Sequence, residues 1–217
     1  SAGLAHEIKN PLASLSGSIQ MLMESVTYDP DQERLMRIVL REANRLSSLV
    51  NDFLMFAKPK AGKSEIIQLD RAISEIVDLF ESDPTHRRIE VQKNLSSGLY
   101  VQIDPEHLRQ LMWNLLNNAA EAIADQGMIS VALYTGRKNY ACISITDNGC
   151  GIPAEEVPTI FDPFYSTKPK GTGLGLSIVQ QLLGIYGGLI DIESSPGTGT
   201  TVTLKLRQEN AVRTKVA

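Results

Sequence analysis

The chain has 217 residues, enough for one large domain or two small ones. Its 21 basic and 25 acidic residues give a net charge of −4, which argues against a general nucleic-acid-binding surface. It has two cysteines and three histidines in no zinc-binding spacing, and no apolar run reaches the roughly 18 residues of a membrane span. We therefore expect a cytoplasmic globular protein, or a fragment of a longer and membrane-anchored one.

Residues 1–57 have the periodicity of two helices. Apolar residues recur every three or four positions on both sides of a break at 27–31, and the second series approaches a heptad seam. Asp29 is placed to cap the second helix and Pro30 to open it. Because two helices alone would expose much of this seam, we expect a homodimer that forms a four-helix bundle. The alternative is that the hairpin packs on the rest of its own chain.

The rest of the chain predicts a linker at 58–64, a mixed domain at 65–208 and a tail at 209–217. Strands are expected at 66–69, 88–93, 99–103, 128–135, 140–146, 189–193 and 201–206. Helices are expected after the caps Asp70 and Asp104 and over 174–186. Helices beside a mostly antiparallel sheet indicate an α/β sandwich of two layers.

His6 lies about 200° around the first helix from Leu4 and Ile8, so we place it away from the apolar seam. Glu7 is adjacent, and Asn10 lies one turn further along the same face. An exposed neutral imidazole with a carboxylate beside it can act as a nucleophile near pH 7. A surface histidine with no catalytic role would have the same local pattern, so this residue alone does not decide the function.

Asn114 and Asn118 stand four residues apart on an otherwise apolar helix. Asparagine is a poor helix former, and its amide oxygen is a ligand that suits Mg²⁺. The alternative is a pair of buried asparagines that bond to their neighbours.

Two glycine-rich segments could contact a nucleotide. Residues 147–151 follow a predicted strand, where the Asp147 carboxylate can accept a hydrogen bond from an exocyclic amine and glycines let a flat ring approach the backbone. Residues 171–175 open a helix whose N–H groups suit phosphate, with Lys168 and Lys170 just upstream. The second segment has neither Walker nor dinucleotide spacing, and ordinary loops use similar residues.

In this order the segments resemble the dimerisation and catalytic core of a bacterial sensor histidine kinase. The matching boxes are the phosphoacceptor box at 5–12, the N box at 114–118, glycine boxes at 147–151, 171–175 and 197–200, and the F box at 161–164. The resemblance covers about 1–206 and is strongest to the nitrogen-regulation type.

The resemblance implies a set of residue roles. His6 would accept the γ-phosphoryl group of ATP with Glu7 as base, and Asn10 would orient water in a reverse phosphatase reaction. Asn118 would hold Mg²⁺, and Asn114 would support the phosphates. The adenine pocket and the lid over the nucleotide would be formed by Asp147, Gly149, Gly151, Lys168, Gly171, Gly173 and Gly175.

The implied partner is a response regulator whose receiver domain takes the phosphoryl group from His6 onto an aspartate. A sensory part and any membrane attachment are expected upstream of Ser1, and the short run before His6 predicts a weakened dimer. One alternative is a clamp-type ATPase of the same superfamily, which has no use for an exposed His6. Another is a non-catalytic or phosphatase-only scaffold, against which Asn118 and Asp147 weigh.

Overall fold

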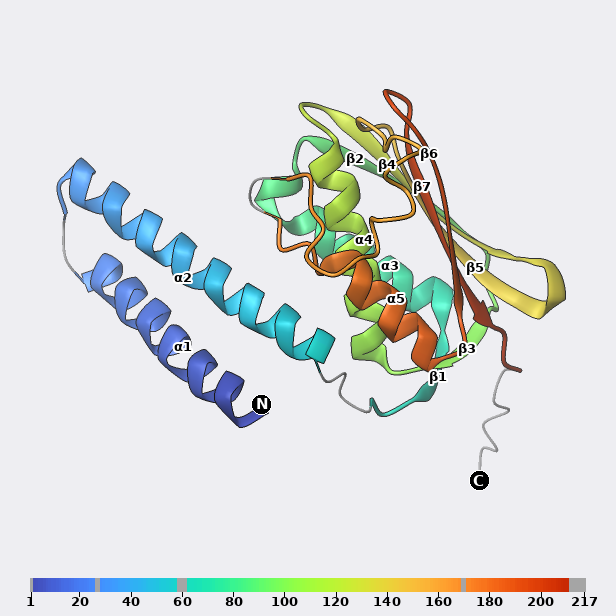
Figure 1. Cartoon of the computed structure of the whole chain (residues 1–217), viewed down its shortest axis with the longest axis horizontal. Helices are drawn as coiled ribbons and strands as arrows, with labels where there is room; N and C mark the ends of the chain where they lie inside the picture. Colours follow the sequence, from blue (N-terminus) through green and yellow to red (C-terminus); the bar gives the residue numbers. More distant parts are fainter. Residues whose placement is uncertain (1, 26–27, 58–61, 169–170, 211–217) are drawn as a thin grey trace. The chain divides into compact units, whose positions relative to one another are not determined.

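The computed structural model describes residues 2–25, 28–57, 62–168 and 171–210, and it describes their side chains except at 2–10, 12, 24, 25, 48 and 55. The chain divides into two compact units, Ser1–Lys60 and Ala61–Ala217 (Figure 1). The division falls inside the segment 58–64 that the sequence predicts as a linker.

The first unit is a helical hairpin, as the sequence predicts. Helices α1 (Ala2–Ser25) and α2 (Pro30–Ala57) lie side by side (Figure 1). Asp29 caps α2, because its Oδ1 accepts the N–H groups of Asp31 and Gln32 at 3.0 and 2.9 Å. Ile19 and Ala43 are buried within the hairpin. Many large apolar side chains of both helices stay exposed, namely Leu15, Met21, Leu22, Leu35, Ile38, Val39, Leu46 and Phe53.

The second unit contains a five-stranded sheet in the order β2-β4-β5-β7-β6. The strands are β2 (Ile89–Leu95), β4 (Gly127–Thr135), β5 (Tyr140–Asp147), β6 (Leu189–Ser195) and β7 (Gly199–Arg207). All neighbours pair antiparallel except β2 and β4, which are parallel. A separate antiparallel pair joins β1 (Glu65–Gln68) to β3 (Tyr100–Ile103). The predicted, mostly antiparallel sheet is confirmed.

Three helices form the other layer and cover one face of the sheet (Figure 1). They are α3 (Leu69–Ser82), α4 (Pro105–Ala122) and α5 (Gly175–Ile185). Short 3-10 turns occur at Pro84–His86 and Arg137–Asn139. The side chains between the layers are fully buried, among them Phe80, Leu111, Met112, Leu116, Ile143 and Ile145. Removal of this apolar surface from water holds the sandwich together.

One of the two predicted helix caps in this unit is wrong. Asp104 caps α4 as expected, since its Oδ1 accepts the Glu106 N–H at 2.8 Å. Asp70, however, lies inside the first turn of α3, which begins at Leu69. The strand β1 runs directly into this helix, and the Leu69 N–H donates to the Leu99 carbonyl at 2.9 Å. The first turn is therefore anchored by neighbouring backbone, which leaves no capping role for Asp70.

Candidate functional site

A polar stripe on α4 forms one side of the candidate site. The helix buries its apolar side chains in the core, while Asn114 and Asn118 are half-buried on another side. The Asn114 Nδ2 atom is buried and has no hydrogen-bond partner in the described part of the chain. An unpaired buried amide costs about 1–3 kcal/mol, so this atom favours a ligand site over two structural asparagines satisfied by neighbours.

The N-terminal end of α5 lies against this stripe. A Cβ atom placed on Gly175 would lie 3.9 Å from both the Asn114 Oδ1 and the Asn118 Nδ2 atoms. No side chain in the described residues caps α5, which begins at Gly175. The first N–H groups of a helix carry a partial positive charge. Amide groups beside such a helix end can hold an anion together with its cation.

Asp147 ends β5 and is 7% exposed. Its Oδ1 accepts the Gly149 N–H at 2.8 Å. Burial raises the pKa of the Asp147 carboxyl above its ordinary value, and the N–H groups of Gly149 and Thr200 and the charge of Lys168 oppose this shift. A buried carboxyl group with few fixed partners is suited to accept a hydrogen bond from a ligand amine.

The loop after β5 packs its backbone closely on two neighbours. A Cβ on Gly149 would lie 2.6 Å from the Ala122 carbonyl oxygen, at the end of α4. Gly151 has a φ of +70°, and a Cβ there would overlap the Ser195 carbonyl. These two glycines are therefore required by close backbone packing, which the sequence argument about ring approach did not anticipate. The packing fixes Asp147 relative to α4.

A long loop precedes α5 and carries the predicted lid residues. The Phe164 N–H donates to the Gly173 carbonyl at 2.9 Å, and Gly173 has a φ of +67°. The Gly171 N–H donates to the Lys168 carbonyl at 3.2 Å. Lys168 Nζ lies 2.6 Å from Oε2 of Glu121 on α4. Residues 169–170, which belong to the predicted lid, lie outside the described residues.

Glu121 is a residue that sequence reasoning missed. It follows Asn114 by seven positions and Asn118 by three, so the three residues form one stripe on α4. The i, i+4, i+7 spacing of the three residues is a sequence signal that could have placed Glu121 beside the asparagines. Arg88 was also missed, although its guanidinium donates to carbonyls at the end of α4, namely those of Ala120, Ile123, Ala124 and Asp125. No local pattern signals a contact between residues so far apart in sequence.

His6, Glu7 and Asn10 lie in α1, in the first unit. Their side chains are outside the described residues, so their predicted roles stay predictions. Among the described residues, no three His, Cys, Asp or Glu side chains gather as a metal site. Within the same residues, no helix is both long and apolar enough to cross a bilayer.

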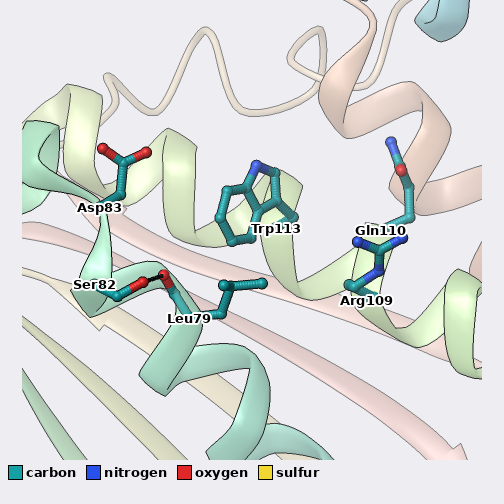
Figure 2. A pocket seen from close by; sticks show the side chains of 6 residues that line it. All are labelled: Leu79, Ser82, Asp83, Arg109, Gln110 and Trp113. Atoms are coloured by element: carbon teal, nitrogen blue, oxygen red, sulfur yellow. Dashed lines mark hydrogen bonds between the residues drawn. The ribbon is translucent and has the colours of Figure 1, made fainter.

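A pocket of about 460 Å³ between α3 and α4 is not part of this site (Figure 2). It is lined by Leu79, Ser82, Asp83, Arg109, Gln110 and Trp113, none of which the sequence singles out as functional. Trp113 precedes Asn114 directly, and consecutive helical residues point about 100° apart. Gln110, however, stands one turn before Asn114 on the same side of α4, so the pocket borders the asparagine stripe at that end.

Comparison with known proteins identifies both units. Residues 1–62 match the His Kinase A (phospho-acceptor) domain. Residues 103–210 match the histidine kinase-, DNA gyrase B-, and HSP90-like ATPases. Over 206 residues the chain is 37% identical to the sensor histidine kinase ZraS of Klebsiella oxytoca, covering 94% of this chain and 45% of ZraS. The chain belongs to the sensor histidine kinase family.

Solved structures of histidine kinases share the fold. Full-length ShkA in complex with AMPPNP matches with a TM-score of 0.82 and 25% identity, covering 97% of this chain and 46% of ShkA. The kinase ThkA in complex with the response regulator TrrA matches with a TM-score of 0.70 and 27% identity, covering 96% of this chain and 60% of ThkA. The chain spans 34% to 49% of the length of the curated relatives compared.

Proposed function

We propose that this chain is the catalytic core of a sensor histidine kinase, which transfers the γ-phosphoryl group of ATP to His6 and then to an aspartate of a response regulator. The observation that carries the nucleotide site is the buried, unpaired amide of Asn114, with Asn118 and the start of α5 beside it. Family membership supports the reaction. The solved complexes of ShkA with AMPPNP and ThkA with TrrA support ATP and a receiver domain as partners.

Each part of the site suits one part of the nucleotide. Asp147 would accept the adenine amine, in the pocket shaped by Gly149 and Gly151. The N–H groups that begin α5 and the Asn114 amide would bind the phosphates. The remaining lid residues, Lys168, Gly171, Gly173 and Gly175, would cover the phosphates.

Asn118 would hold Mg²⁺ through its amide oxygen, with phosphate oxygens and water as the other ligands. The described residues fit this role, because the Asn118 amide lies beside the start of α5, and Mg²⁺ takes oxygen ligands that include phosphate oxygens. Bound Mg²⁺ would neutralise charge on the phosphates.

In the first unit His6 would receive the phosphoryl group on a ring nitrogen while the bond to ADP breaks. Glu7 would take the proton from the other nitrogen. Phosphoryl transfer requires little covalent chemistry from the protein, so positioning and charge neutralisation would supply most of the rate. Asn10 would orient water in the opposing phosphatase reaction, in which water breaks the aspartyl–phosphate bond of the regulator and inorganic phosphate leaves.

A homodimer is part of this proposal. The hairpin leaves apolar residues of both helices exposed, including Leu46 at 49% and Phe53 at 49%. A second hairpin would bury such a seam as a four-helix bundle. The regulator would dock on the hairpin near His6, because its aspartate must reach the imidazole.

Calorimetric titration with AMPPNP and Mg²⁺ tests the nucleotide site. We expect the wild-type chain to bind, Asn118→Ala to lose the Mg²⁺-dependent part of the affinity, and the control Asn94→Ala, on the exposed side of β2, to bind normally. Absence of binding by the wild-type chain would refute the proposal and favour the non-catalytic scaffold. A clamp-type ATPase would also bind AMPPNP with Mg²⁺. Transfer of labelled phosphate from ATP to His6 distinguishes a kinase from it.

A further inference from the structure

The ion pair between Glu121 and Lys168 joins the helix that carries the asparagines to the loop before α5. Lys168 Nζ lies 2.6 Å from Oε2 of Glu121, although 47 positions separate the two residues. Both side chains are partly exposed, at 37% for Lys168 and 56% for Glu121. The contact is therefore open to exchange with a ligand from solvent.

The two residues lie at the proposed nucleotide site. Glu121 continues the stripe of Asn114 and Asn118 by one turn of α4. Burial raises the pKa of Asp147, and the charge of Lys168 is close enough to oppose this shift. The Lys168 ammonium is thus held by a carboxylate on the asparagine helix, within electrostatic range of Asp147.

On the basis of the proposed function, we propose that Glu121 is a positioning residue that competes with the nucleotide phosphates for the ammonium group of Lys168. Without nucleotide, the ion pair fastens the Lys168 segment to α4. When nucleotide binds, the ammonium leaves the carboxylate for the more highly charged phosphates. Glu121 thereby lowers the affinity for nucleotide and keeps the loop ordered between turnovers.

The size of the effect follows from the exposure of the pair. Exposed ion pairs contribute little, so breaking this one should change an equilibrium constant by about 1.5- to 5-fold. Glu121→Gln removes the charge and keeps the shape of the side chain. We expect it to lower the Kd for AMPPNP with Mg²⁺ by this factor. Lys168→Gln should raise the Kd.

A double-mutant cycle separates the ion pair from other effects of the carboxylate. In the Lys168→Gln background, Glu121→Gln should leave the Kd unchanged, because the ammonium group is already absent. Glu106→Gln is the matched control, since Glu106 also pairs on α4, with Arg109, away from the asparagine stripe. It should bind nucleotide as the wild type does.

Hydrogen exchange without nucleotide supplies a second measurement. The backbone amides of residues 165–168 should exchange faster in Glu121→Gln and in Lys168→Gln than in the wild type. Saturating AMPPNP should restore protection in Glu121→Gln. The control Glu106→Gln should exchange at the wild-type rate throughout.

Three results would overturn the inference. If Glu121→Gln lowers the Kd for AMPPNP equally in the wild-type chain and in the Lys168→Gln chain, the charge of Glu121 acts on the phosphates directly. If Glu121→Gln instead weakens the Mg²⁺-dependent binding of AMPPNP, Glu121 supports the metal. If hydrogen exchange at residues 165–168 is unchanged in Glu121→Gln, Glu121 does not hold the loop on α4. If the wild type binds no nucleotide, the proposed function fails, while the exchange measurement still decides whether the ion pair orders the loop.

Discussion

Arg88 should stabilise the second unit through the end of α4. Its guanidinium donates to the Ala120 carbonyl at 3.0 Å and the Ala124 carbonyl at 2.6 Å, and also bonds to those of Ile123 and Asp125. These are carbonyls at a helix end, which lack partners within the helix. A net hydrogen bond contributes about 0.5–1.5 kcal/mol, and because the arginine is exposed we take the lower half of this range. For the four bonds together, Arg88→Ala should therefore lower the free energy of unfolding by about 2–4 kcal/mol.

Thermal unfolding followed by circular dichroism measures this loss. For a unit of 150–250 residues, 1 kcal/mol shifts the Tm by about 2–4 °C, so we expect Arg88→Ala to unfold about 4–16 °C below the wild type. The Tm of Arg88→Lys should lie between those of Arg88→Ala and the wild type, since one ammonium group cannot donate to the same carbonyls as the planar guanidinium. Arg87→Ala, at the exposed neighbouring position, is the control and should unfold with the wild type. A Tm of Arg88→Ala within about 1 °C of the wild type would refute the reasoning.

Two further predictions concern the nucleotide site. Asp147→Asn should abolish AMPPNP binding and still make the fold more stable at pH 7, because burial raises the pKa of Asp147 and penalises its charged form. As pH rises, the Asp147 carboxyl ionises in the unfolded chain before it does in the folded one, so the free energy of unfolding of the wild type falls from about pH 4 upward. If the difference in this free energy between the wild type and Asp147→Asn does not close below about pH 4, burial of the charge is not its cause. Gly175→Ala should fold normally, because the added Cβ meets Asn114 and Asn118 at an ordinary 3.9 Å. It should weaken AMPPNP binding in calorimetry by about 10-fold as it fills the space beside the amides, and unchanged affinity would place the phosphates elsewhere.

The sequence predicted the architecture well because the fold depends on regular patterns. Periods of three and four residues located the hairpin, and alternation located the sheet. Local chemistry was sufficient for the caps at Asp29 and Asp104, where an acidic residue precedes proline. It failed at Asp70, because the competing bond from Leu69 to Leu99 comes from a strand connection that no local pattern contains.

The candidate site was predicted residue by residue, but its internal contacts were not. Asn114, Asn118 and Gly175 were each singled out from the sequence, and the structure brings them together. The ion pair of Lys168 with Glu121 joins segments that meet only when α4 packs beside α5. Such contacts depend on tertiary packing and are invisible to periodicity and motif spacing. The requirement for glycine at position 149 likewise comes from backbone packing on α4.

Phosphorylation of His6 is the central claim, and labelling with γ-³²P-ATP and Mg²⁺ tests it directly. We expect the wild-type chain to acquire a label that is stable to base and labile to acid, as a phosphohistidine is. His6→Gln should bind AMPPNP as the wild type does and acquire no label. A label of unchanged amount and stability in His6→Gln would contradict the account.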